Sequence, residues 1–176
     1  MNFFGGPENS IKQSGIQDGT MIADFGCGTG AYTLALSKLF RSSHIFAIDV
    51  QKPLLDHLMS EAHREHLNNI ETIWADIEKH GGSKLRDQSV DWVVLSNTLF
   101  LSEHKDIVLK EAHRVLKRNG KLCFFEWTGS YGGMGPLPEQ VITQEQAAVL
   151  FEQAGFKIDH TFEAGTHHYG LIGTVI

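Results

Sequence analysis

The chain has 176 residues, 41% of them hydrophobic, and this length and composition predict one compact domain with a hydrophobic core. A formal net charge of −6 disfavours a surface that grips nucleic-acid phosphates. Because no segment approaches the ~20 apolar residues of a membrane span, and the first residues lack a signal-peptide pattern, we expect a cytoplasmic protein with neither a nucleic-acid partner nor a membrane span.

Short β-branched runs alternate with stretches of helical period through most of the chain, a pattern typical of a parallel sheet covered on both faces. The predicted strands are 20–25, 44–50, 70–76, 90–97 and 121–127. The predicted helices are 31–40, 53–67 and 102–120, the last opened by Ser102 and closed by Asn119 and Gly120. Residues 78–89 leave room for one helical turn.

The C-terminal part has a different composition. Residues 128–140 carry four glycines and two prolines, which predicts a loop. A capping box, Thr143 with Gln146, opens a helix over 143–156, and 157–175 predicts two antiparallel strands around a glycine turn. We therefore expect a single domain over 1–176, with a short N-terminal segment (1–19) and a flexible loop (129–142).

A glycine-rich stretch, GCGTGA at 26–31, follows the first predicted strand. It satisfies the dinucleotide fingerprint, and Asp49 lies where a ribose-binding acid belongs. However, Asp24 stands just ahead of the glycines, and a carboxylate there opposes an anionic pyrophosphate. It suits a cationic amino group instead, such as that of S-adenosylmethionine.

Three aspartates end three consecutive predicted strands: Asp24, Asp49 and Asp76. An acid after the second strand can accept hydrogen bonds from both ribose hydroxyls, and an acceptor after the third suits the adenine amine. The three carboxylates are more specific than the glycines and favour S-adenosylmethionine as the cofactor.

These motifs resemble those of the class I S-adenosylmethionine-dependent methyltransferases over nearly the whole chain: DFGCGTG at 24–30, AID at 47–49, AD at 75–76, VDWVVLSNTLF at 90–100 and EAHRVLKRNGKLCFFEW at 111–127. Within that superfamily the chain is similar to the group related to ubiquinone- and menaquinone-biosynthesis and arsenite methyltransferases. The resemblance implies an α/β, Rossmann-like fold. Its seven-strand, mostly parallel sheet has an antiparallel C-terminal hairpin and helices on both faces.

The resemblance also implies a set of cofactor-binding residues. The methionine part is assigned to Asp24, Gly26, Cys27, Gly28 and Gly30, the ribose to Asp49 and Val50, the adenine to Asp76 and Ile77, and the pocket floor to residues 96–99, chiefly Ser96, Asn97 and Leu99. The chain departs from the family in two ways. Its short N-terminus leaves little of the helical cap that closes many small-molecule methyltransferases, and it lacks the set of cysteines that trivalent arsenic needs.

The expected reaction is in-line transfer of the methyl group to a small or medium-sized acceptor. Positioning contributes roughly 7 to 11 kcal/mol to such a reaction, and a base is needed only for a protonated acceptor. The candidate bases are Glu126, His168 and His104. We expect Phe3, Phe4 and residues 129–138 to cover the acceptor site partly.

Other functions remain open at this point. The chain could be a non-catalytic module that binds S-adenosylmethionine or a partner protein, or, less in keeping with Asp24, a NAD-dependent oxidoreductase. A homodimer is compatible with the short N-terminus. His63 and His66 share a helix face without a fourth ligand, so we expect no metal site.

Overall fold

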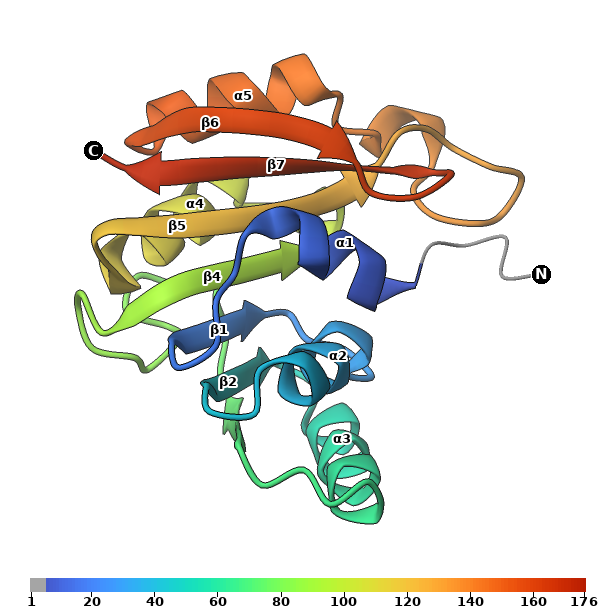
Figure 1. Cartoon of the computed structure of the whole chain (residues 1–176). Coiled ribbons are helices and arrows are strands. Elements are labelled where there is room, and N and C mark those ends of the chain that lie inside the picture. Colours follow the sequence, from blue (N-terminus) through green and yellow to red (C-terminus); the bar gives the residue numbers. More distant parts are fainter. Residues whose placement is uncertain (1–5) are drawn as a thin grey trace.

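The computed structural model describes residues 6–176, which form a seven-stranded sheet with helices on both faces (Figure 1). The strands are β1 (Met21–Phe25), β2 (His44–Asp49), β3 (Ile70–Trp74), β4 (Val90–Ser96), β5 (Leu116–Trp127), β6 (Phe156–Glu163) and β7 (His168–Val175). The helices are α1 (Pro7–Ser14), α2 (Ala31–Leu39), α3 (Lys52–Arg64), α4 (Lys105–Val115) and α5 (Gln144–Gln153), with short 3-10 turns η1 (Leu99–Leu101) and η2 (Pro138–Gln140).

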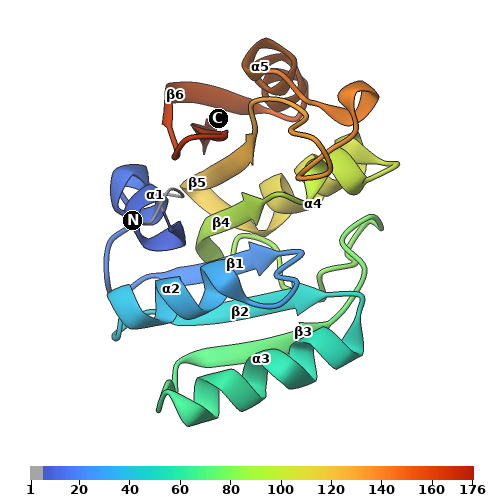
Figure 2. The ribbon, with the colours of Figure 1, turned by 90° about the vertical axis from the view of Figure 1, so that its right-hand side faces the viewer.

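The sheet has the strand order β3-β2-β1-β4-β5-β7-β6. Strands β1 to β5 are mutually parallel, and β7 is antiparallel to both of its neighbours, β5 and β6. The predicted fold class is confirmed, including the antiparallel C-terminal hairpin of β6 and β7. The carboxyl ends of β1 to β5 therefore meet along one edge of the sheet, and the arrowheads of β1, β2 and β4 mark this edge in Figure 2.

Two hydrophobic layers hold the helices to the sheet. Side chains alternate along β5, so that Phe125 packs with Ile11 of α1 and Leu36 of α2, while Phe124 packs with Val108 of α4 and Phe151 of α5. Helices α1, α2 and α3 lie on one face, and α4 and α5 on the other (Figures 1 and 2). Within residues 6–176, no helix is both long and apolar enough to cross a membrane.

The helix predicted over 102–120 is shorter at both ends. Helix α4 begins at Lys105, and Leu116 already belongs to β5, where it is buried and pairs with Val90. Burial of Leu116 against the sheet overrides the helical pattern, and the predicted stop at Asn119 becomes an irregularity inside the strand, with a φ of 61°.

The segment expected to be a short N-terminal stretch contains α1. Pro7 occupies its first turn, Gly15 ends it in the left-handed conformation, and Ile11 is fully buried between the sheet and α2. These start and stop signals are present in the sequence and were missed. Phe3 and Phe4, expected to cover the site, lie outside the described residues.

Candidate active site

The glycine loop joins β1 to α2, and its three glycines meet different requirements. Gly26 and Gly30 have φ angles of 71° and 88°, and a Cβ atom on either would lie within 2.5 Å of the side chain of Thr98 or Leu58. A Cβ on Gly28 would meet nothing within 4 Å, because this residue lines an open cavity. Gly26 and Gly30 thus serve close packing, whereas Gly28 keeps backbone exposed to the cavity.

Asp24 lies beneath this loop and is fully buried. Thr33, in the first turn of α2, donates a hydrogen bond to Oδ2 at 2.5 Å, while Oδ1 has no hydrogen-bond partner among residues 6–176. Burial raises the pKa of Asp24 to about 6, although the Thr33 hydrogen bond opposes the rise. A buried carboxylate oxygen without a partner is costly unless a donor reaches it, and a ligand amine can be that donor.

Asp49, at the end of β2, ties the glycine loop to the next segment. Its Oδ2 accepts a hydrogen bond from the Gly28 amide (2.9 Å), and its Oδ1 accepts one from the Gln51 amide (2.8 Å). These two bonds fix the carboxylate at the cavity wall, and each oxygen keeps a lone pair for a ligand hydroxyl.

The cavity itself, hereafter the strand-end cavity, lies at the carboxyl ends of β1 to β4 and has a volume of about 270 Å³. Its lining includes Gly26, Gly28, Asp49, Val50, Asp76, Ile77, Asn97 and Thr98 from the predicted set, together with Gln51, Ala75, Glu78, Leu101, Ser102 and Val108, which were not predicted as site residues. The missed residues are neighbours in sequence of predicted ones or belong to η1 and α4, whose approach depends on the fold. Asp76 is held by Lys79 at 3.0 Å, and this hydrogen bond lowers its pKa, so that it stays ionised.

The segment after β4 forms one wall of the strand-end cavity. Asn97 adopts a left-handed φ of 52°, its amide donates to the Phe125 carbonyl (2.9 Å), and its Oδ1 is buried without a partner among the described residues. Ser96 is the last residue of β4, and Leu99 is fully buried in the core. Of the predicted floor residues, Asn97 has the unsatisfied polar atom.

Four other predicted cofactor-site residues act through packing or position. Cys27 packs with Ala47 and Leu55, and burial raises the pKa of its thiol. Val50 is an exposed apolar residue at the cavity mouth, Ile77 is buried in its wall, and Gly30 caps α2.

Two candidate bases lie on the neighbouring strand ends. In the register of β5 and β7, Glu126 pairs with Tyr169 and Trp127 pairs with His168. Glu126 is fully buried. Its Oε1 accepts from the Trp127 amide (2.9 Å), its Oε2 has no partner in the described part of the chain, and burial raises its pKa to about 7 despite the nearby charge of Lys105.

His168 belongs to the opposite face of the sheet from Glu126. Its ring contacts that of Trp127 at a tilt of 42°, with centroids 4.2 Å apart, and its Nε2 is buried without a hydrogen-bond partner within 6–176. Burial, followed by the charge of His167, lowers its pKa, so the ring is neutral and can accept a proton. The two side chains share a sheet edge but not a face.

His104 lies apart from this pair. It is exposed at the start of α4, its amide donates to Glu78 (3.1 Å), and its charge acts on Asp76. The structure therefore brings His104 to the Asp76 side of the strand-end cavity. Within 6–176, no three His, Cys, Asp or Glu side chains are grouped so that they could hold a metal ion.

Comparison with known proteins identifies the family. Residues 23–124 match the family model described as a methyltransferase domain, which covers more than half of the chain. The chain belongs to the class I S-adenosylmethionine-dependent methyltransferases. Its cofactor is S-adenosylmethionine, in agreement with the prediction from the three aspartates and against the nicotinamide alternative.

Individual relatives agree with this membership. An S-adenosylmethionine-dependent methyltransferase structure from Aquifex aeolicus superposes with a TM-score of 0.87 at 26% identity, covering 97% of this chain and 89% of the other. Human arsenite methyltransferase is 33% identical over 77% of this chain and 40% of its own length. Demethylmenaquinone methyltransferase from a Geobacillus species is 28% identical over 68% of this chain and 50% of its own length. The methyltransferase thus spans about half the length, or less, of these two curated relatives.

The residues of this methyltransferase fit the cofactor on structural grounds. Gly28 leaves open space where a side chain would intrude, and Asp24 and Asn97 each hold a buried oxygen that lacks a donor among the residues described. The strand-end cavity has a carboxylate at each of two neighbouring strand ends, with an apolar wall between them. The amino group of the cofactor matches the unpartnered oxygens, its ribose hydroxyls and adenine amine match the two carboxylates, and its adenine ring matches the apolar wall.

Proposed function

We propose that this chain binds S-adenosylmethionine in the strand-end cavity and catalyses transfer of its methyl group to a small organic acceptor. The observation that carries the proposal is the convergence of Gly28, Asp49 and Asp76 on one cavity from three separate strand ends. A nucleoside with both ribose hydroxyls and an exocyclic amine matches these groups.

Each part of the cavity has a proposed task. Asp49 accepts hydrogen bonds from the ribose hydroxyls, and Asp76 with the Ile77 backbone recognises the adenine edge, while Val50 and Leu101 cover its faces. The amino-acid part of the cofactor is assigned to the glycine loop, to Asp24 beneath that loop and to Asn97. The unpartnered Oδ1 atoms of Asp24 and Asn97 are the proposed acceptors for its amino group. When bound, the cofactor supplies an activated methyl group, so the chain needs only to orient the acceptor, exclude water and, where required, remove a proton.

Glu126 is the proposed base for an acceptor that carries a proton. Its pKa of about 7 leaves a substantial fraction ionised at neutral pH, and its Oε2 has no internal donor among residues 6–176. His168, neutral and on the opposite face, is the second candidate. His104 is a weaker candidate, because it lies beside Asp76.

The acceptor is proposed to be a small organic molecule. The matched relatives are named for arsenite and demethylmenaquinone, both small molecules. An arsenite acceptor is disfavoured, because the only two cysteines of the chain, Cys27 and Cys123, are buried singly, and trivalent arsenic needs several soft thiolates.

Location and assembly are also proposals. Free, unpaired cysteines are typical of a reducing compartment and support a cytoplasmic location. The net charge of −6 supports the expectation of no nucleic-acid partner. A homodimer stays a prediction that sedimentation of the purified chain would check.

Asp49→Asn tests the cofactor site. Loss of the charge-assisted hydrogen bonds should weaken S-adenosylhomocysteine binding roughly 10- to 100-fold in calorimetry, while NADH should bind neither protein. Asp56→Asn, an exposed position on α3, is the control and should bind like wild type. Asp76→Ala, at a half-exposed position, gives a second variant if Asp49→Asn unfolds. Tight NADH binding, or wild-type affinity in both cavity variants, would refute the proposal.

A further inference from the structure

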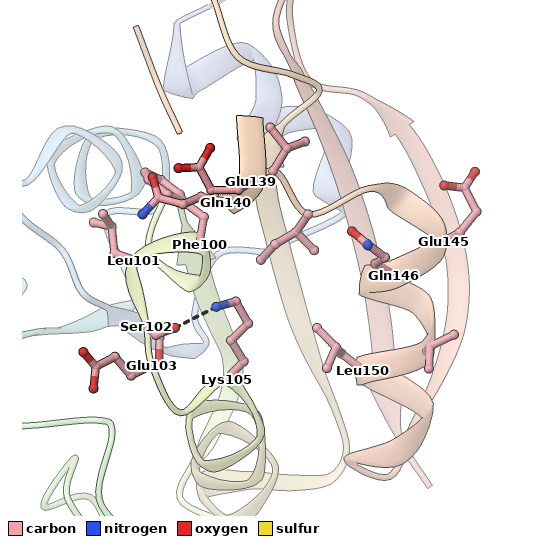
Figure 3. A pocket seen from close by; sticks show the side chains of 13 residues that line it. Phe100, Leu101, Ser102, Glu103, Lys105, Glu139, Gln140, Glu145, Gln146 and Leu150 are labelled. Atoms are coloured by element: carbon pink, nitrogen blue, oxygen red, sulfur yellow. Dashed lines mark hydrogen bonds between the residues drawn. The ribbon is translucent and has the colours of Figure 1, made fainter. Parts of the chain in front are cut away.

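A second cavity lies between the starts of α4 and α5 (Figure 3). This cavity, the α4–α5 groove, has a volume of about 830 Å³ and is walled by apolar side chains of η1, of the segment before α5 and of α5 itself: Phe100, Leu101, Ile142, Val149 and Leu150. It shares only Leu101 and Ser102 with the strand-end cavity, so it is a neighbouring space and not part of the cofactor site.

Two hydrogen-bond donors project into this apolar space. Lys105 lies on the α4 side of the groove, and its Nζ donates to the Ser102 carbonyl at 2.7 Å, which leaves two ammonium protons for a ligand (Figure 3). Across from it, Gln146 directs its amide toward the groove. Because the Gln146 Oε1 already accepts from the Thr143 amide (2.9 Å), its NH₂ group is the part free to bind a ligand.

Charge in the surroundings favours an acceptor group at this point. Helices α4 and α5 both begin at the groove, so their positive ends face it and add to the charge of Lys105. Three carboxylates, those of Glu103, Glu139 and Glu145, also line the groove, and in Figure 3 they point away from Lys105. They would repel a second negative charge, so the groove suits one anionic group attached to an apolar body.

We propose that the α4–α5 groove binds an apolar carboxylic acid. The carboxylate accepts hydrogen bonds from Lys105 and Gln146, and the apolar body lies along Phe100, Ile142 and Leu150. This site stands independently of whether the ligand receives a methyl group, since it depends only on the two donors and the apolar walls.

Calorimetry with octanoate tests the site, with octan-1-ol and octylamine as probes of equal length. Wild type should bind octanoate at least tenfold more tightly than either probe. Lys105→Met should lower octanoate affinity by roughly tenfold and leave octanol affinity unchanged, because only the charge-assisted bond is lost. Lys110→Met, also on α4 but outside the groove, is the matched control and should bind octanoate like wild type.

A second variant separates the groove from a non-specific charge effect. Val149 is exposed, so Val149→Trp should fold and fill the groove, and it should abolish binding of octanoate and octanol alike. Equal affinity for octanoate and octylamine, an equal loss in Lys105→Met and Lys110→Met, or unaltered binding in Val149→Trp would overturn the proposal. S-adenosylhomocysteine binding, measured in the same variants, reports separately on the cofactor site.

Discussion

Buried carboxyl groups are the residues of this chain whose chemistry departs most from that of the free amino acids. Asp24 and Glu126 are both fully buried, and burial raises their pKa values to about 6 and about 7. A buried carboxyl group is tolerated at its lowest cost when protonated, so both groups make the folded state depend on pH.

Glu126→Gln should change how stability depends on pH. Between pH 4.5 and about 7, folded Glu126 holds a proton that the unfolded chain releases, so its contribution to stability is fully present below pH 4.5 and is lost as pH rises through 7. The shift corresponds to roughly 3 kcal/mol. Urea unfolding at pH 5 and pH 8 should therefore show a smaller decline in Glu126→Gln than in wild type.

The exposed Glu152 of α5 supplies the control for that measurement. Glu152→Gln should follow the wild-type pH dependence, because this side chain is exposed to solvent and has no hydrogen-bond or ion-pair partner within residues 6–176 to lose. An identical pH dependence in wild type and Glu126→Gln would contradict the assigned pKa and remove the main argument for Glu126 as a base.

The sequence predicts site residues best where the backbone alone dictates the chemistry. The three aspartates and Gly28 follow from their positions at strand ends, and Asp49 and Asp76 do line one cavity. Thr33, which donates to Asp24, and Leu101, which joins two cavities, were not predicted. Their contacts depend on the orientation of α2 and η1, which is decided by packing far along the chain.

At the scale of elements, α4 holds in place the long connection between β3 and β4. The carboxylate of Glu111 accepts hydrogen bonds from the backbone amides of Gly81 (2.9 Å) and Ser83 (3.0 Å), and Arg114 bonds to it at 2.6 Å and to the Leu85 carbonyl at 3.0 Å. Burial alone would raise the pKa of Glu111, but the Arg114 and Ser83 hydrogen bonds hold it at about 2. This connection continues directly from Asp76 and Ile77 of the strand-end cavity.

Glu111→Gln should loosen that connection. The stabilisation from Glu111 is present above pH 4.5 and is lost as pH falls through about 2, so at pH 7 the variant lacks a contribution on the order of 3 kcal/mol. Amide hydrogen exchange at Gly81 and Ser83 should become faster in the variant than in wild type, while exchange at the sheet amides should change less. Glu65→Gln, which breaks the half-exposed pair with Lys38, should leave both amides protected. Unchanged exchange at Gly81 would count against the clamp.

Element boundaries show what local patterns cannot reveal. Helix α5 was predicted from its Thr143 capping box, and both bonds of that box are present. The predicted end of α4 was wrong. The helical pattern continues to Gly120, but burial of Leu116 beside Val90 outweighs it and places Leu116 in β5. A capping box involves residues three apart and can therefore be predicted from the sequence. The first residue of a strand depends on the neighbouring strand with which it pairs and cannot.

At the scale of the whole molecule, the mostly parallel seven-strand sheet and the helices on both of its faces followed from the alternation of strand and helix patterns together with the family resemblance. The reactivity of the two buried cysteines can be used to measure how often different parts of the domain open to solvent. Cys123 is fully buried in the central part of β5, and Cys27 is nearly buried in the glycine loop, with burial raising the pKa of both thiols.

Single-thiol variants should therefore react with 5,5′-dithiobis(2-nitrobenzoate) at rates set by opening. With Cys123→Ser, the remaining Cys27 should react through local movement of the loop, and S-adenosylhomocysteine should slow it. With Cys27→Ser, the remaining Cys123 should react more slowly, since its side chain packs in the layer between β5 and α1, beside Ile11 and Ser14, and its exposure requires α1 to leave the sheet. Equal rates for the two variants in native buffer would show that the glycine loop and α1 open together.

The antiparallel insertion of β7 imposes an order of assembly on a chain made from one end. Strand β6 precedes β7 in the chain but pairs only with β7. Its apolar residues Phe156 and Ile158 therefore have no paired strand beside them until β7 has been synthesised. Strands β1 to β5 can meanwhile form a nascent sheet whose β5 edge stays open. Residues 168–175 then pair with β5 and β6 together. The nascent chain is therefore most open to chaperone binding and misassociation just before β7 is in place.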